Sequence, residues 1–99
     1  MQPKIKYTFS AKMWQHQGQG GWYFVSLPKE ISKEIRENLK LQEEGWGRMK
    51  ATASINQLEW DTAIWLDKKQ DTYLLPIKGD IRKKGKLELK QILQVSVSI

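Results

Sequence analysis

Hydrophobic and polar residues alternate along most of this chain of 99 residues. Residues 4–14 begin the pattern, because every second position from Ile5 to Met13 is apolar or aromatic and most positions between them are polar. A period of two is typical of an antiparallel strand with one buried face. The alternation, or a compact apolar run, recurs and predicts six strands: residues 4–14, 22–27, 47–55, 58–66, 72–77 and 92–99.

Two segments have a helical rather than a strand pattern. After Pro28, apolar residues repeat at intervals of four: Ile31, Ile35 and Leu39. This spacing places them on one face of a helix over residues 28–39, and proline suits the first turn because its missing N–H would be unpaired there. A second, short helix is expected over residues 80–84, with Asp80 as its N-cap.

Two connections between strands are informative. The stretch 15–21 contains three glycines, which accept a positive φ at little steric cost, so the first two strands are expected to form a hairpin with a long loop. Asn56 and Gln57 alone separate the third and fourth strands, which is typical of a tight hairpin turn. Gln57 occupies the place where such a turn favours glycine.

The two halves of the chain resemble each other. Residues 23–31 and 73–81 match in their apolar positions at an offset of fifty, and an acidic residue precedes the last isoleucine of each. We therefore predict a mainly β fold, a small six-stranded pseudobarrel of two similar halves at about 1–56 and 57–99, capped by one clear and one short helix. A chain of this length is expected to form a single domain, residues 1–99.

Short motifs along the chain occur in a recognisable order. A Phe-x-Ala element at residues 9–11 is followed by two glycines, an aromatic strand ending in Leu27-Pro28, a Tyr-x-Leu-Pro strand at 73–76, and Ile-Arg-Lys at 81–83. In this order and spacing the chain resembles the bacterial domain-of-unknown-function family 1905. The resemblance covers nearly the whole sequence and implies a double-split β-pseudobarrel, similar in fold to AbrB-type regulators and MazE-type antitoxins.

The resemblance implies a fold but no mechanism, since that family has no established catalytic residues. Some of its members are fused to a domain associated with bacteriocin protection, which favours an accessory role. The chain departs from the family at two turns: Gln57 stands where a glycine is preferred, and Lys90-Gln91 stands where Gly-Asp is preferred. Both departures concern local turn geometry.

Composition narrows the range of functions. Seventeen Lys and Arg residues against eleven Asp and Glu give a formal net charge of +6, and there is no cysteine. The absence of cysteine excludes disulfides, thiolate nucleophiles and cysteine zinc sites, and it favours a cytoplasmic location. No apolar run approaches a membrane span and the N-terminus lacks a signal-peptide core, so we expect no membrane partner.

Candidate catalytic chemistry is sparse. His16 is the only histidine, and it lies in the glycine-rich loop without the partners that a catalytic triad or a zinc site requires. The glycines at 18–21 precede a strand, so they form neither a P-loop nor a dinucleotide-binding loop. Glu59 and Asp61 share a strand face and are interpreted as solvated carboxylates. We therefore expect no catalytic residue, no cofactor and no metal.

Binding is the favoured class of function, and two features indicate where. Six cations outnumber two carboxylates between residues 78 and 90, and the chain contains five tryptophans, of which the strand pattern places Trp60 in the core and leaves Trp65 exposed. The candidate binding residues are Arg82, Lys83, Lys84, Lys86, Trp22 and Tyr73.

Three hypotheses for the function remain open. The first is a nucleic-acid-binding protein that uses the basic cluster formed by Arg82, Lys83, Lys84, Lys86 and Lys90. The second is a small-molecule-binding domain with a barrel mouth lined by Trp and Tyr. The third is an accessory domain whose partner is another protein; in every case we expect a monomer or a weak dimer.

Overall fold

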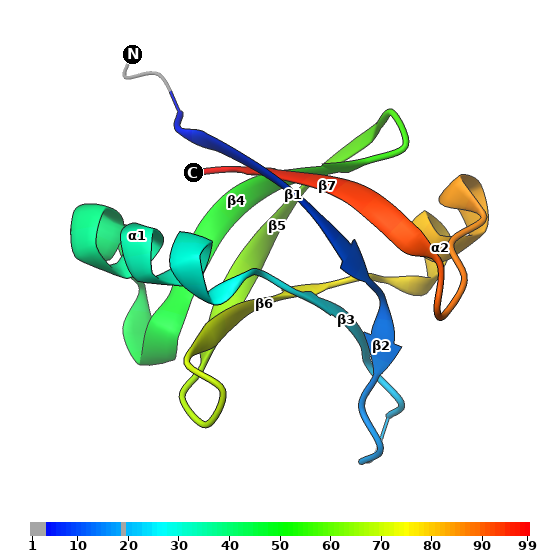
Figure 1. Ribbon diagram of the computed structural model, residues 1–99, viewed down its shortest axis with the longest axis horizontal. Coiled ribbons are helices and arrows are strands. Elements are labelled where there is room, and N and C mark those ends of the chain that lie inside the picture. Colours follow the sequence, from blue (N-terminus) through cyan, green and yellow to red (C-terminus); the bar gives the residue numbers. More distant parts are fainter. Residues whose placement is uncertain (1–3, 19) are drawn as a thin grey trace.

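The computed structural model describes residues 4–18 and 20–99, without the side chain of Trp46. Gln19 of the predicted glycine loop therefore lies outside the described residues. The strands are β1 (Lys6–Lys12), β2 (Trp14–Gln15), β3 (Tyr23–Ser26), β4 (Arg48–Ile55), β5 (Leu58–Asp67), β6 (Thr72–Pro76) and β7 (Ile92–Ser98). They form one antiparallel sheet in the order β1-β7-β4-β5-β6-β3-β2, which curls into a half-barrel (Figure 1).

The mainly β prediction is confirmed, whereas the count of six strands is wrong. The first predicted strand is two strands, because Met13 interrupts the ladder between β1 and β2. β1 pairs with β7 and β2 pairs with β3, so the two ends of the strand order belong to one bent N-terminal segment. The Met13 side chain is buried, and the bend turns the chain from one end of the curled sheet to the other.

Two α-helices lie at opposite ends of the sheet: α1 (Lys29–Leu39) and α2 (Gly79–Gly85) (Figure 1). Both were predicted, and the apolar stripe of α1 faces the core, with Ile35 fully buried. The predicted capping role of Asp80 is wrong. Lys78 is the N-cap residue of α2, and Asp80 lies within the first turn without a side-chain capping bond. Within the described residues, neither helix has the length and apolar composition required to cross a membrane.

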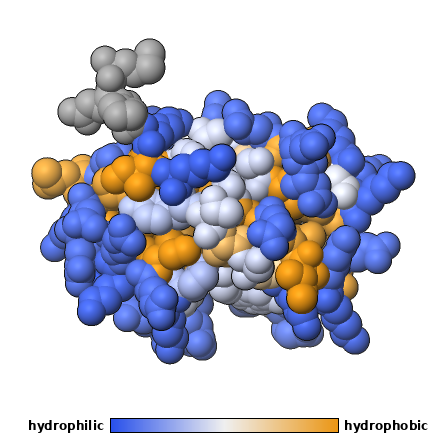
Figure 2. All heavy atoms as spheres, turned by 45° about the horizontal axis from the view of Figure 1, so that its top comes forward, coloured by the Kyte–Doolittle hydropathy of each residue, from blue (hydrophilic) through white to orange (hydrophobic). Residues whose placement is uncertain are grey.

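The core is the inner face of the curled sheet, closed by α1. Every second residue of β4 and β7 is buried in the core, as the alternation in the sequence predicted. The buried residues of β4 are Met49, Ala51, Ala53 and Ile55, and those of β7 are Leu93, Val95 and Val97. Short 3₁₀ helices η1 (Lys40–Gln42) and η2 (Gly45–Gly47) connect α1 to β4. Figure 2 shows a surface on which hydrophilic side chains surround separate hydrophobic patches.

The pairing of β3 with β6 is reciprocal at an offset of fifty. The Leu27 N–H donates to the Tyr73 carbonyl and the Ile77 N–H donates to the Tyr23 carbonyl, each at 2.9 Å. Leu27 and Ile77 are both buried. Whether the complete halves superimpose stays a prediction, which superposition of residues 1–56 on residues 57–99 tests directly.

Replacing Gln57 with glycine is expected to raise the free energy of unfolding by about 0.5–1 kcal/mol. Asn56 and Gln57 both have positive φ, 51° and 71°, as a type I′ turn requires, and a glycine removes the steric cost of that conformation. Urea unfolding measures the difference. Gln70→Gly is the matched control in a turn without a positive φ at that position, and it is expected to lower stability instead. Equal effects at both positions would contradict the turn argument.

Candidate binding site

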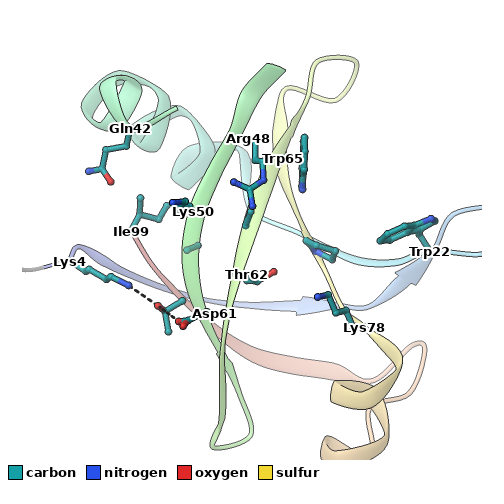
Figure 3. A pocket seen from close by; sticks show the side chains of 14 residues that line it. Lys4, Trp22, Gln42, Arg48, Lys50, Asp61, Thr62, Trp65, Lys78 and Ile99 are labelled. Atoms are coloured by element: carbon teal, nitrogen blue, oxygen red, sulfur yellow. Dashed lines mark hydrogen bonds between the residues drawn. The ribbon is translucent and has the colours of Figure 1, made fainter. Parts of the chain in front are cut away.

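A wide cleft of about 940 Å³ crosses the outer face of the sheet, on the side opposite to the core (Figure 3). β4 and β5 form its centre. The side chains that give it chemical character are two tryptophans and four cations: Trp22, Trp65, Lys4, Arg48, Lys50 and Lys78. We call this surface the basic–aromatic cleft.

Arg48 and Trp65 form a cation–π pair at one end of the cleft. The tight turn at Asn56 and Gln57 fixes the register of β4 against β5, and this register places Arg48 directly opposite Trp65. The guanidinium carbon lies 5.7 Å from the centroid of the indole ring. Trp65 nevertheless remains 42% exposed. Much of the indole surface is therefore available to a ligand.

Trp22 and Lys78 both line the other end of the cleft. Phe24 pairs with Pro76, and the hydrogen bond from the Ile77 N–H to the Tyr23 carbonyl continues this register outward. Continued by one residue, this register would bring Trp22 to the level of Lys78. Figure 3 shows both side chains on the same flank of the cleft. Trp22 is 58% exposed, so its ring is even more accessible than that of Trp65.

The Trp22 ring packs against a neighbouring aromatic side chain. It stacks with Phe24 at a centroid distance of 6.4 Å and an interplanar angle of 14°. Phe24 also contacts Trp14, at 5.3 Å and 40°. The Trp14 indole N–H donates to the Ser26 hydroxyl oxygen at 2.8 Å, which fixes that ring against β3. These contacts give the exposed ring of Trp22 a defined position.

Two of the four cations of the cleft are paired with a carboxylate, and a third is hydrogen-bonded to a hydroxyl. Glu44 forms ion pairs with Arg48 and with Lys50, the second at 3.7 Å between Nζ and Oε2. Lys4 donates to the Thr52 hydroxyl at 2.7 Å, and that hydroxyl donates to Asp61 at 3.2 Å (Figure 3). All of these side chains are solvent-accessible, so each pair is weak and an incoming anion can replace the carboxylate.

The predicted site residues occupy three different places. Arg82 is half-buried, and its guanidinium carbon lies 3.7 Å from the ring centroid of Tyr23. This cation–π contact joins α2 to β3. The side chains of Lys83, Lys84 and Lys86 are exposed on and just after α2. Of the six, Trp22 alone lines the basic–aromatic cleft.

Tyr73 is only 1% exposed and lies at a second cleft, of about 520 Å³, beneath α1. Burial raises the pKa of its phenol, Glu43 raises this pKa further, and Arg36 opposes the rise. Three cations and three carboxylates line this cleft, and Arg36 is paired with Asp71 at 2.9 Å. The balance of charge gives the second cleft no preference for anions.

The candidate catalytic groups are all on the surface. His16 is exposed, and its Nδ1 accepts the Gly18 backbone N–H at 2.8 Å. Glu59 and Asp61 are both solvent-exposed, as the sequence indicated. In residues 4–18 and 20–99, no group of three or more His, Asp and Glu side chains is arranged to hold a metal ion.

Comparison with known families gives one result. Residues 9–97 match the profile of DUF1905, a domain of unknown function. The chain belongs to this family. No curated protein matches the chain significantly. Membership of the DUF1905 family therefore confirms the resemblance noted in the sequence and assigns no activity to the cleft.

Sequence reasoning missed Arg48 and Lys50. Their signal was present in the hairpin, since a two-residue turn at Asn56 and Gln57 fixes which residues of β4 and β5 face each other. Counting outward from the turn pairs Arg48 with Trp65. The part played by Trp22 required the pairing of β3 with β6, which no local turn sets.

Proposed function

We propose that this domain is a non-catalytic nucleic-acid-binding module and that its binding site is the basic–aromatic cleft. One observation carries the proposal: two exposed indole rings, Trp22 and Trp65, line the same cleft as four cations, and the Arg48 guanidinium lies over the Trp65 ring. A nucleic acid offers the complementary pair of groups, because each phosphate is accompanied by an aromatic base.

The charge of the cleft supports the same proposal. Of the described residues, four cations and the carboxylate of Asp61 line it, and Glu44, the residue before η2, pairs with Arg48 and Lys50. The net charge of +6 for the whole chain adds a long-range attraction for polyanions. The exposed lysines of α2, Lys83, Lys84 and Lys86, are a second surface that could contact phosphates outside the cleft.

The scaffold in this proposal is a pseudobarrel of two related halves. The reciprocal bonds between β3 and β6 support that description, since each half contributes the same two positions to the pair. The scaffold's role is to hold cations and rings on rigid strands. Strand positions fix a binding residue better than a loop does.

Salt dependence tests the proposal. If Lys4, Arg48, Lys50 and Lys78 each displace one counterion, log affinity is expected to fall against log salt with a slope of about −2.8 on single strands or −3.6 on duplex. A fourfold rise in salt then weakens binding by roughly 50- to 150-fold. Fluorescence anisotropy with a labelled oligonucleotide between about 50 and 200 mM NaCl measures this slope.

Two triple variants of equal charge locate the site. Replacing Arg48, Lys50 and Lys78 with glutamine is expected to flatten the slope by about 2–3 units. Replacing Lys83, Lys84 and Lys86 with glutamine removes the same charge on α2 and is expected to change the slope much less. If only the second variant lost binding, the binding site would lie on α2 and not in the cleft. Absence of salt-dependent binding by the parent protein would refute the proposed function.

Glu44→Gln is expected to tighten oligonucleotide binding by about 2- to 10-fold at low salt. The carboxylate pairs with both Arg48 and Lys50, so removing its charge frees two cations for phosphates. Glu43→Gln is the matched control, because the adjacent Glu43 lines the second cleft and its neutralisation changes the net charge equally. Equal tightening by both variants would show that net charge, and not the ion pairs of Glu44, governs affinity.

A further inference from the structure

The basic–aromatic cleft exposes flat aromatic surface in addition to charge. Trp22 and Trp65 are 58% and 42% exposed, although burying an indole ring would stabilise the folded protein. Neither ring is needed to close the core, since both lie on the outer face of the sheet. An exposed indole beside a cation is suited to stack against the planar face of a base while the cation contacts the adjoining phosphate.

The two indole rings lie too far apart in the sheet for a single base to contact both. β5 and β3 both pair with β6, so Trp65 and Trp22 lie two strands apart. Trp65 is level with Leu74, and the β3–β6 register, continued by one residue beyond the bond from Ile77 to Tyr23, puts Trp22 near the level of residue 78. Strand spacing and rise per residue then separate the two backbones by roughly 16 Å. Pro76 lines the cleft between them, and a flexible chain of several nucleotides is required to reach both rings.

A duplex does not expose the base faces on which these indole rings can stack. Base faces are covered by their neighbours in a stacked double helix, so an indole ring reaches a face only where the strand is single or unpaired. Sequence-specific reading of a duplex would also require an element that enters a groove. α2 has seven residues, and the exposed side of α1 carries carboxylates as well as cations, including the pair Lys33 and Glu37.

Resting on the proposed function, we infer that the ligand of the cleft is a single-stranded nucleic acid, with one base stacked on Trp65 and another on Trp22. Arg48 and Lys78 hold the phosphates beside these two bases. Lys50 and Lys4 continue the cationic track across β4 toward the N-terminal segment (Figure 3). The rings give preference for unpaired bases, and the cations give affinity without sequence preference.

Three oligonucleotides of equal charge separate the role of the bases from that of the phosphates. The probes are an oligothymidine of about 15 nucleotides, within the range of known single-strand sites, an abasic strand of the same length, and a duplex with the same number of phosphates. At low salt the oligothymidine is expected to bind at least tenfold more tightly than the other two.

Substitutions at the two rings test the stacking. Trp22→Leu and Trp65→Leu are each expected to weaken oligothymidine binding by about 5- to 100-fold, while affinity for the abasic strand stays unchanged. Trp22→Phe and Trp65→Phe keep an aromatic face and are expected to retain most of the affinity. Both positions are exposed, and unchanged urea unfolding confirms that the variants fold.

The outcomes distinguish this inference from the function on which it rests. Equal affinity for all three probes, with a steep salt slope, would overturn the single-strand inference and leave nucleic-acid binding intact. The same conclusion follows if the leucine variants weaken abasic and oligothymidine binding equally. No salt-dependent binding to any probe would overturn the proposed function itself.

Discussion

Ile35→Ala is expected to lower the free energy of unfolding by about 2–4 kcal/mol, because it removes buried methyl and methylene groups and leaves a cavity. Ile35 is fully buried where α1 packs against the core. The surrounding side chains belong to strands fixed by their ladders, so they cannot relax fully into the space. Urea unfolding followed by circular dichroism measures the loss.

Leu41→Ala is the matched control for this prediction. Leu41 follows the same helix in η1, and its side chain is fully exposed. Truncating an exposed side chain is expected to change stability by no more than about 0.5 kcal/mol. If Ile35→Ala cost as little as Leu41→Ala, α1 would not be packed on the sheet as described.

Gly47→Ala is expected to destabilise the domain by a similar amount, about 2–4 kcal/mol, for a different reason. Gly47 has a φ of 80°, which side chains rarely adopt, and a Cβ there would lie 2.8 Å from the Leu66 Cβ. The methyl group must therefore displace the backbone of β5 or the start of β4. Urea unfolding again measures the cost.

The same substitution is expected to disturb the cleft. Backbone hydrogen bonds join Glu44 and Arg48 in both directions around η2, and Gly47 lies within the loop that they close. Gly45→Ala is the control in that loop, since a Cβ at Gly45 has no neighbour within 4 Å. It is expected to leave stability unchanged or raise it by up to about 1 kcal/mol. Equal losses at both glycines would contradict the steric explanation.

Local patterns predicted the elements of this fold closely. The four-residue spacing of Ile31, Ile35 and Leu39 predicted α1, and the alternation in β4 and β7 predicted which side chains are buried. These predictions succeed because periodicity is set by the geometry of one helix or one strand, and a neighbour only has to cover the apolar face. The division at Met13 was missed, since alternation continues unbroken through the bend.

The candidate site was predicted less well. The sequence pointed to the dense cations of residues 78–90, but clustering along the chain does not decide which side chains share a surface. Arg82 is occupied by stacking on Tyr23, and Tyr73 is buried beneath α1. Trp65 was predicted to be exposed from its strand parity, and the structure bears this out.

The sequence by itself determined the helices, the buried faces and the strands apart from the division at Met13, and its two-residue turn set the register of the β4–β5 hairpin, in which Arg48 pairs with Trp65. Each of these follows from a pattern within one segment or across one short turn. Only the tertiary structure decided that Trp22 and Lys78 join that pair in one cleft. β6 brings these residues together by pairing with β5 on one side and with β3 on the other. The β3–β6 pairing joins segments far apart in the chain, and it depends on how the whole sheet curls around the core, which no local period encodes.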